Sequence, residues 1–222
     1  MNIKDFNEKC HDFLKNIKEE DGLYNYYQHK LYTDKNIFNE RELIFIKYFM
    51  EKVDKKCKIL EIGAGLGSLS HYLNLNGFNN ITINEFDKKR MDLAKLLNNK
   101  FKNSCNLAFI DFKKMKLHEY DYIFCVNGKT TYLGSKQYIP IFEKIIEQGV
   151  KLILVADSLG ETKEGALLNN IYKHEKEEHY LNSSTEFTDC LINKYNFYII
   201  ETVTSDVTNK KIPIYVIYKD TV

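Results

Sequence analysis

The spacing of apolar residues changes repeatedly along the chain from about residue 39 onward. Short apolar runs bounded by polar or glycine residues predict strands, whereas apolar residues three or four positions apart predict helices. The expected strands span 58–62, 80–84, 106–110, 120–126 and 151–156, and helices are expected after Asn39, from Leu66, from Asp87 and near Tyr138. Because strands and helices alternate, the pattern predicts an α/β fold with a mostly parallel sheet that helices cover on both faces.

Polar residues mark the expected starts of two helices. Asn39 with Glu42 three positions later forms a capping-box pattern, and Asp87 is placed to cap the helix that ends near Lys100. The apolar face expected for the first of these helices carries Leu43, Ile46, Met50 and Val53.

The C-terminal third follows a different pattern. Ser183 and Glu186 form a second capping-box pattern for a helix to Tyr195, and the runs 197–204 and 212–218 predict an antiparallel strand pair. Residues 159–182 are charged and form an expected helical insertion. We therefore expect an N-terminal helical cap segment at 1–55 and a core domain at 56–222.

The charge balance excludes one class of partner. The 222 residues include 32 Lys and Arg against 31 Asp and Glu, a formal net charge of +1. A chain without a positive field is not expected to bind nucleic acid non-specifically. Hydrophobic residues make up 44% of the chain, enough for a substantial core.

Cysteine spacing and apolar run length bear on the compartment. The five cysteines are odd in number and have no C-x-x-C spacing, which favours a reducing, cytoplasmic environment over a disulfide framework. The N-terminus lacks the apolar stretch of a signal peptide, and the longest strongly apolar run, 152–156, is too short to span a bilayer. We expect no membrane partner, and the oligomeric state stays open.

A glycine-rich turn follows the first expected strand. The residues read Glu61-Ile62-Gly63-Ala64-Gly65-Leu66-Gly67, with Ser68 where a dinucleotide fingerprint has its last glycine. Glycines at a strand-to-helix turn allow a ligand to touch the backbone. A pyrophosphate would be repelled by Glu61, whereas a ligand with an ammonium or sulfonium group would be attracted.

Two further acids follow the next two expected strands. Glu85 lies where a carboxylate accepts both hydroxyls of a ribose, and Asp111 lies where it could accept from an adenine amino group with Phe112 packing on the ring. Open α/β folds bind ligands at the carboxyl ends of their strands.

At these residues the sequence resembles the class I S-adenosylmethionine-dependent methyltransferases, from about Lys58 to Ser158 and more weakly beyond. The resemblance implies S-adenosylmethionine as cofactor and a Rossmann-like, seven-stranded sheet of order 3-2-1-4-5-7-6 with the last strand antiparallel. It also implies that Glu61 and the glycine turn bind the methionine end and Glu85 the ribose. The remaining implied contacts are Asp111 and Phe112 to the adenine and the backbone of Asn127 near the methionine amino group.

Each of these residues has a structural alternative. Glu61 could pair with a lysine, Asp111 could serve only the turn after its strand, Phe112 could belong to the core, and Asn127 with Gly128 could form only a turn. Asp87 competes with Glu85 for the ribose role.

The residues after the fourth strand bear on the methyl acceptor. They read Asn127-Gly128-Lys129-Thr130-Thr131-Tyr132, without the Asn/Asp-Pro-Pro-Tyr/Phe motif usual in methyltransferases that act on base amines or glutamine amides. We therefore expect methyl transfer to an oxygen or nitrogen of a small metabolite, such as a sugar or amine precursor. The acceptor pocket is expected to draw on the N-terminal segment and the 159–182 insertion.

The catalytic base is not fixed by any pattern. Candidate catalytic residues are Asp157, His29 and Tyr132, and candidate acceptor-binding residues are Tyr24, Tyr27, His174 and His179. Each histidine could instead be a surface or packing residue, and the tyrosines could pack together. His174 and His179 are five positions apart, which argues against a metal pair on one helix face, and no metal site is expected.

Three other functions remain in view. A protein or peptide methyltransferase would use the same fold with an open groove. A non-catalytic cofactor-binding protein would explain the absence of an obvious base. A nicotinamide dehydrogenase is disfavoured by Glu61 and by the missing last glycine.

Overall fold

The computed structural model describes residues 1–15, 36–126, 138–155, 184–204, 209 and 211–220. The chain divides into two compact units, one made of residues 1–57 and 64–110 and the other of residues 58–63 and 111–222. The boundary between cap and core expected at 55/56 stays a prediction. Each unit is described by itself.

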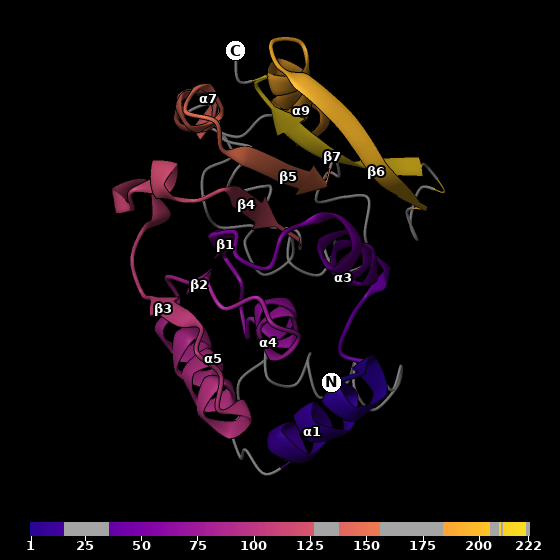
Figure 1. Ribbon diagram of the computed structural model, residues 1–222, viewed down its shortest axis with the longest axis vertical. Helices are drawn as coiled ribbons and strands as arrows, with labels where there is room; N and C mark the ends of the chain where they lie inside the picture. Colours follow the sequence, from indigo (N-terminus) through magenta and orange to yellow (C-terminus); the bar gives the residue numbers. More distant parts are fainter. Residues whose placement is uncertain (16–35, 127–137, 156–183, 205–208, 210, 221–222) are drawn as a thin grey trace, which may run out of the picture. The chain divides into compact units, whose positions relative to one another are not determined.

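The first unit contains four helices and two strands among its described residues. These are α1 (Ile3–Lys15), α3 (Glu40–Lys52), α4 (Ser68–Leu75), β2 (Ile81–Asn84), α5 (Lys88–Phe101) and β3 (Asn106–Ala108). Helix α4 packs against α3, α5 and β2, and α1 packs against α5 (Figure 1). The strands pair in parallel from Thr82 opposite Asn106 to Asn84 opposite Ala108.

An aromatic cluster attaches α1 to this unit. The ring of Phe6 stacks on Phe38 at 5.3 Å and on Phe101 at 4.9 Å, and it meets Tyr72 edge-on at 5.4 Å. Such pairs stabilise beyond the burial of their area. Phe6 is fully buried, so the N-terminal helix is held by a core contact.

Helix α3 begins as its capping-box pattern predicts. The Asn39 side chain accepts from the Glu42 amide, and the Glu42 carboxylate accepts from the Asn39 amide. The predicted apolar face is wrong in part, because Met50 is exposed while Phe45 and Phe49 are fully buried. The buried stripe follows the larger aromatic side chains, which remove more apolar area from water.

The second unit contains the remaining strands. Its described elements are β1 (Ile59–Ile62), the 3₁₀ turns η1 (Phe112–Lys114) and η2 (Leu117–Glu119), β4 (Tyr122–Cys125), α7 (Ile139–Glu147), β5 (Lys151–Val155), α9 (Ser184–Ile192), β6 (Asn196–Thr204) and β7 (Lys211–Tyr218). Helix α7 packs against β5, β7 and α9 (Figure 1). The core between them includes Leu60, Ile123, Phe142 and Leu152.

The strands form one seven-stranded sheet of order β3-β2-β1-β4-β5-β7-β6. Strand β4 runs parallel to β1 and β5, whereas β7 runs antiparallel to β5 and β6. The expected order and the antiparallel last strand are therefore confirmed. The Ser183 cap and the 159–182 insertion lie outside the described residues.

No helix in the part of the chain that the structure describes is both long enough and apolar enough to cross a membrane.

Candidate functional site

The glycine turn adopts a backbone that side chains disfavour. Gly63, Gly65 and Gly67 have φ of 62°, 62° and 66°, in the left-handed region. A Cβ on Gly67 would lie 2.8 Å from Cδ1 of Ile83, so this position excludes even alanine without movement of its neighbour. The turn is closed by the Gly67 amide, which donates to the Ala64 carbonyl at 2.9 Å.

Glu85 holds this turn to the end of β2. One carboxylate oxygen accepts from the Gly65 amide at 2.9 Å, and the other accepts from the amides of Phe86 and Asp87 at 2.9 and 3.1 Å. The side chain is only 1% exposed. Three backbone donors offset the cost of burying the carboxylate, because they replace hydrogen bonds that its oxygens would make to water. Glu85 therefore orders the glycine turn through the Gly65 amide.

Asp87 has the separate role expected for it. Its carboxylate accepts from the Arg90 amide at 3.0 Å and caps α5. This leaves Glu85 as the acid at the end of β2.

Ser68 lies beside the glycine turn and is a further candidate in this unit, with no role indicated by the sequence pattern. It is the first residue of α4, where the Gly67 cap provides no side-chain hydrogen bond. Its Oγ is buried and has no hydrogen-bond partner in the described part of the chain. A helix N-terminus with a buried hydroxyl suits a ligand carboxylate. In the sequence, the position of Ser68 directly after the last glycine of the turn was the feature that could have indicated a ligand contact.

Phe86 and Asn84 flank Glu85 and are two further candidates that the sequence patterns did not indicate. Phe86 is apolar and yet 60% exposed, which suits a surface that a ligand ring covers. Asn84 is 2% exposed, and its amide donates to the carbonyls of Ala108 and Ile110. The sequence could have indicated Phe86, because it is an apolar residue directly after the acid that ends a strand. It could not have indicated the Asn84 contacts, because they join residues far apart in sequence.

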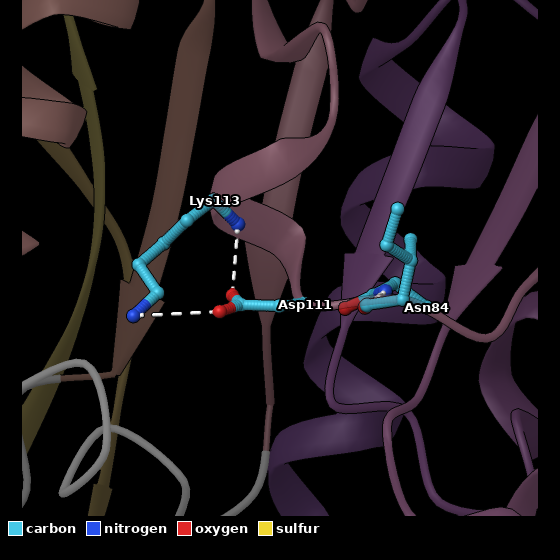
Figure 2. Close-up of polar contacts among 4 residues, drawn as sticks. Asn84, Asp111 and Lys113 are labelled. Atoms are coloured by element: carbon cyan, nitrogen blue, oxygen red, sulfur yellow. Dashed lines mark hydrogen bonds and ion pairs between the residues drawn. The ribbon is translucent and has the colours of Figure 1, made fainter.

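The second unit carries the other candidate cofactor residues. Glu61 lies in β1, in register with Phe124 of β4, and is buried. Asp111 follows β3 and caps η1, accepting from the Lys113 amide at 3.0 Å, with the Lys113 ammonium 3.4 Å from its other oxygen (Figure 2). Its side chain is 40% exposed, so the turn role and a ligand role are compatible.

Phe112 packs against other aromatic rings, as expected if it belongs to the core. Its ring lies 5.4 Å from that of Tyr138 and 6.1 Å from that of Phe142, between η1 and α7. The ring is only partly buried. Its expected contact with adenine stays a prediction.

The candidates for catalysis and acceptor binding fall outside the described residues. These are His29, Tyr132 and Asp157 for catalysis and Tyr24, Tyr27, His174 and His179 for the acceptor, together with Asn127. Their roles stay predictions.

The residues that are described fit S-adenosylmethionine. The ligand carries a carboxylate, an ammonium, a sulfonium and a ribose. In the first unit, the α4 N-terminus suits the carboxylate, since the Ser68 hydroxyl has no partner among the described residues, and the buried Glu85 suits the ribose hydroxyls. In the second unit, the buried Glu61 taken by itself suits a cationic group. The strained, bare backbone of the turn allows a ligand to approach it.

Comparisons with solved structures show the same fold. Magnesium protoporphyrin IX methyltransferase (ChlM) from Synechocystis PCC 6803 with bound SAH is 14% identical, with a TM-score of 0.58, over 98% of this chain and 97% of that chain. The bifunctional kinase-methyltransferase WbdD is 12% identical, with a TM-score of 0.60, over 88% of this chain and 43% of that chain. The comparison with curated proteins gives no match.

A family model, described as tellurite resistance protein TehB, matches residues 24–151, more than half of the chain. The match includes the glycine turn and the acids that follow β2 and β3. This protein is an S-adenosylmethionine-dependent methyltransferase, and it belongs to the family of tellurite resistance protein TehB.

Proposed function

We propose that this protein transfers a methyl group from S-adenosylmethionine to a small-molecule acceptor. The main observation that supports S-adenosylmethionine as the cofactor is the buried Glu85 carboxylate, which accepts a hydrogen bond from the amide of Gly65 within the glycine turn. S-adenosylmethionine, when bound, supplies an electrophilic methyl group on a sulfonium. The chain's own residues bind and orient it.

We assign the roles by chemistry. Glu85 orders the turn and accepts hydrogen bonds from the ribose hydroxyls, while the negative charge of Glu61 attracts the positively charged methionine part. Ser68 and the α4 N-terminus bind the methionine carboxylate, and Asp111 accepts from the adenine amino group. Positioning of the two reactants can supply about 7–11 kcal/mol of the barrier.

For the acceptor we retain the expectation of an oxygen or nitrogen of a small metabolite. Asp157, His29 and Tyr132 are the proposed sources of a base, which contributes roughly 10²–10⁴-fold where a hydroxyl must lose its proton. The proposed acceptor pocket includes Tyr24, Tyr27, His174 and His179.

A second acceptor class follows from the family. The description of the matching family names tellurite resistance, and this favours a tellurium oxyanion as the methyl acceptor. Tellurium(IV) carries a lone pair and needs no general base. That lone pair would form the Te–C bond as the C–S bond breaks, and neutral S-adenosylhomocysteine would leave. This acceptor would explain why no base is evident in the sequence.

Calorimetry with S-adenosylhomocysteine tests the cofactor assignment. We expect the wild type to bind and Glu85→Ala to bind at least tenfold more weakly, since it loses charged hydrogen bonds of about 1.5–3 kcal/mol each. Glu119→Gln, at an exposed acid, is the control. Absence of binding by the wild type, or equal binding by Glu85→Ala, would reject the assignment.

Production of S-adenosylhomocysteine in the presence of candidate acceptors tests the substrate class. Tellurite, a panel of small amines and sugars, and a peptide mixture are compared under the same conditions. Turnover with tellurite alone would select the second acceptor class, and turnover with peptides alone would reject a small-molecule acceptor.

A further inference from the structure

Asn84 makes two side-chain hydrogen bonds at the point where β2 and β3 end. Its Nδ2 donates to the Ala108 carbonyl at 3.0 Å and to the Ile110 carbonyl at 2.7 Å. Figure 2 shows the Asn84 side chain beside the segment that leads into Asp111. The Asn84 residue is 2% exposed, whereas Ile110 is 40% exposed, so the two bonds join a buried donor to acceptors at the edge of the fold.

These bonds continue the pairing of the two strands beyond the ladder. The backbone register ends with Asn84 opposite Ala108, where the Glu85 amide donates to the Ala108 carbonyl at 3.3 Å. Ile110 lies two residues past the end of β3. The Asn84 side chain therefore holds a stretch of chain that the strand pairing does not reach.

The held carbonyl belongs to the peptide unit that leads into Asp111. The carbonyl of Ile110 and the Cα of Asp111 lie in one planar peptide group. Fixing that oxygen orients the peptide plane and hence the start of the Asp111 side chain. The Lys113 amide, 3.0 Å from the Asp111 carboxylate, fixes the other end of the same residue.

We propose that Asn84 is a positioning residue for recognition of the adenine amino group. It acts through the Ile110 carbonyl, which orients Asp111 so that the carboxylate accepts from that amino group. This inference rests on the proposed cofactor role of Asp111.

Two ligands that differ at the amino group provide the test. S-adenosylhomocysteine presents a donor at position 6 of the purine, whereas S-inosylhomocysteine presents an oxygen that a carboxylate repels. Calorimetry should show that the wild type prefers S-adenosylhomocysteine by roughly tenfold or more, the range for a hydrogen bond to a charged group. Asp111→Ala should abolish this preference.

Asn84→Leu keeps the volume and removes both donors. We expect the preference to fall toward that of Asp111→Ala, with affinity for S-inosylhomocysteine changed much less. In the Asp111→Ala background, Asn84→Leu should not alter the preference further. Thr82→Val is the matched control, because Thr82 is a buried polar residue on the same face of β2, two positions earlier.

Asn84→Asp serves as a second variant if Asn84→Leu does not fold, since it keeps the shape but turns a carboxylate toward two carbonyls. An unchanged preference in either folded variant overturns the inference. So does an equal loss of both ligands, which indicates a structural role only. A wild type that binds S-adenosylhomocysteine without preference overturns the inference alone, whereas a wild type that binds neither ligand overturns the proposed function as well.

Discussion

His71 is fully buried in α4, and its ring is held in the neutral form. Desolvation by burial lowers its pKa to about 4 from 6.5, and backbone carbonyls of Ala94 and Leu66 oppose this shift to a smaller extent. The Asn103 amide donates to Nδ1 at 3.1 Å, so protonation at Nδ1 would turn two donors toward each other. Protonation of His71 therefore opposes folding.

This burial predicts a pH dependence of stability. The unfolded chain takes up the proton near pH 6.5 and the folded chain only near 4, so the stability is full above 6.5 and falls as the pH drops toward 4. The whole loss is about 3 kcal/mol. Urea unfolding at pH 7, 6, 5 and 4 measures it.

The His71→Gln variant should lose this part of the pH dependence, although it is less stable at pH 7. His118→Gln, at an exposed position, should keep the wild-type profile. A His71→Gln profile parallel to that of the wild type would contradict the assignment.

A second prediction for a single residue concerns the stability of a Gly67 variant. Gly67→Ala places a Cβ 2.8 Å from Ile83 Cδ1 and also forces alanine to φ of 66°. Gly149→Ala meets the same kind of strain at φ of 87° but nothing within 4 Å, so it isolates the backbone cost of about 1–2 kcal/mol. Thermal unfolding should show a larger loss for Gly67→Ala, and Ile83→Val, which removes Cδ1, should restore part of it. Equal losses in the two alanine variants would show that the clash is relieved at no cost.

The capping box of α3 makes a prediction at the scale of an element. Asn39→Ala removes the acceptor for the Glu42 amide, 2.9 Å away, and should cost about 1 kcal/mol. Asn39→Asp keeps the acceptor and should cost much less. Chemical denaturation distinguishes them, and an equal cost for both would mean that the cap contributes nothing.

The elements could be predicted from the sequence because each depends on local patterns. The Asn39 and Asp87 caps follow from residues three positions apart, and the antiparallel β6–β7 pair follows from two apolar runs that are close in sequence. β3 is shorter than expected and ends at Ala108 instead of 110. Beyond Ala108, the Ile110 carbonyl accepts from the Asn84 side chain, in place of a backbone hydrogen bond between the strands. That contact joins residues 26 positions apart, and no local pattern contains it.

The same distinction applies to the candidate site. The glycine turn and the strand-end position of Glu85 could be predicted, since a turn and a strand end are both local. The bond from the Gly65 amide to Glu85 spans 20 positions and depends on the packing of the turn against β2. The Ser68 hydroxyl, which has no partner among the residues that the structure describes, depends on burial, and the sequence alone does not specify burial.

At the scale of the whole molecule, the net charge of +1 says little about the ligand. The informative charges are the few that the fold buries, above all Glu85 and Glu61. A buried carboxylate is costly unless it is hydrogen-bonded or meets a partner of opposite charge. Ligand binding should therefore be visible in the stability of the entire chain.

S-adenosylhomocysteine should stabilise the folded chain by mass action, by about 2.7 kcal/mol at a concentration 100 times its Kd. For a chain of this length, that corresponds to a rise in Tm of about 5–11 °C. The chain has 16 tyrosines and no tryptophan, so circular dichroism or tyrosine fluorescence follows the transition. NADH at the same concentration should leave Tm unchanged, because a pyrophosphate placed near Glu61 is repelled. A rise with NADH equal to that with S-adenosylhomocysteine would contradict this account of ligand selectivity, since it would show that the glycine turn does not distinguish the two ligands.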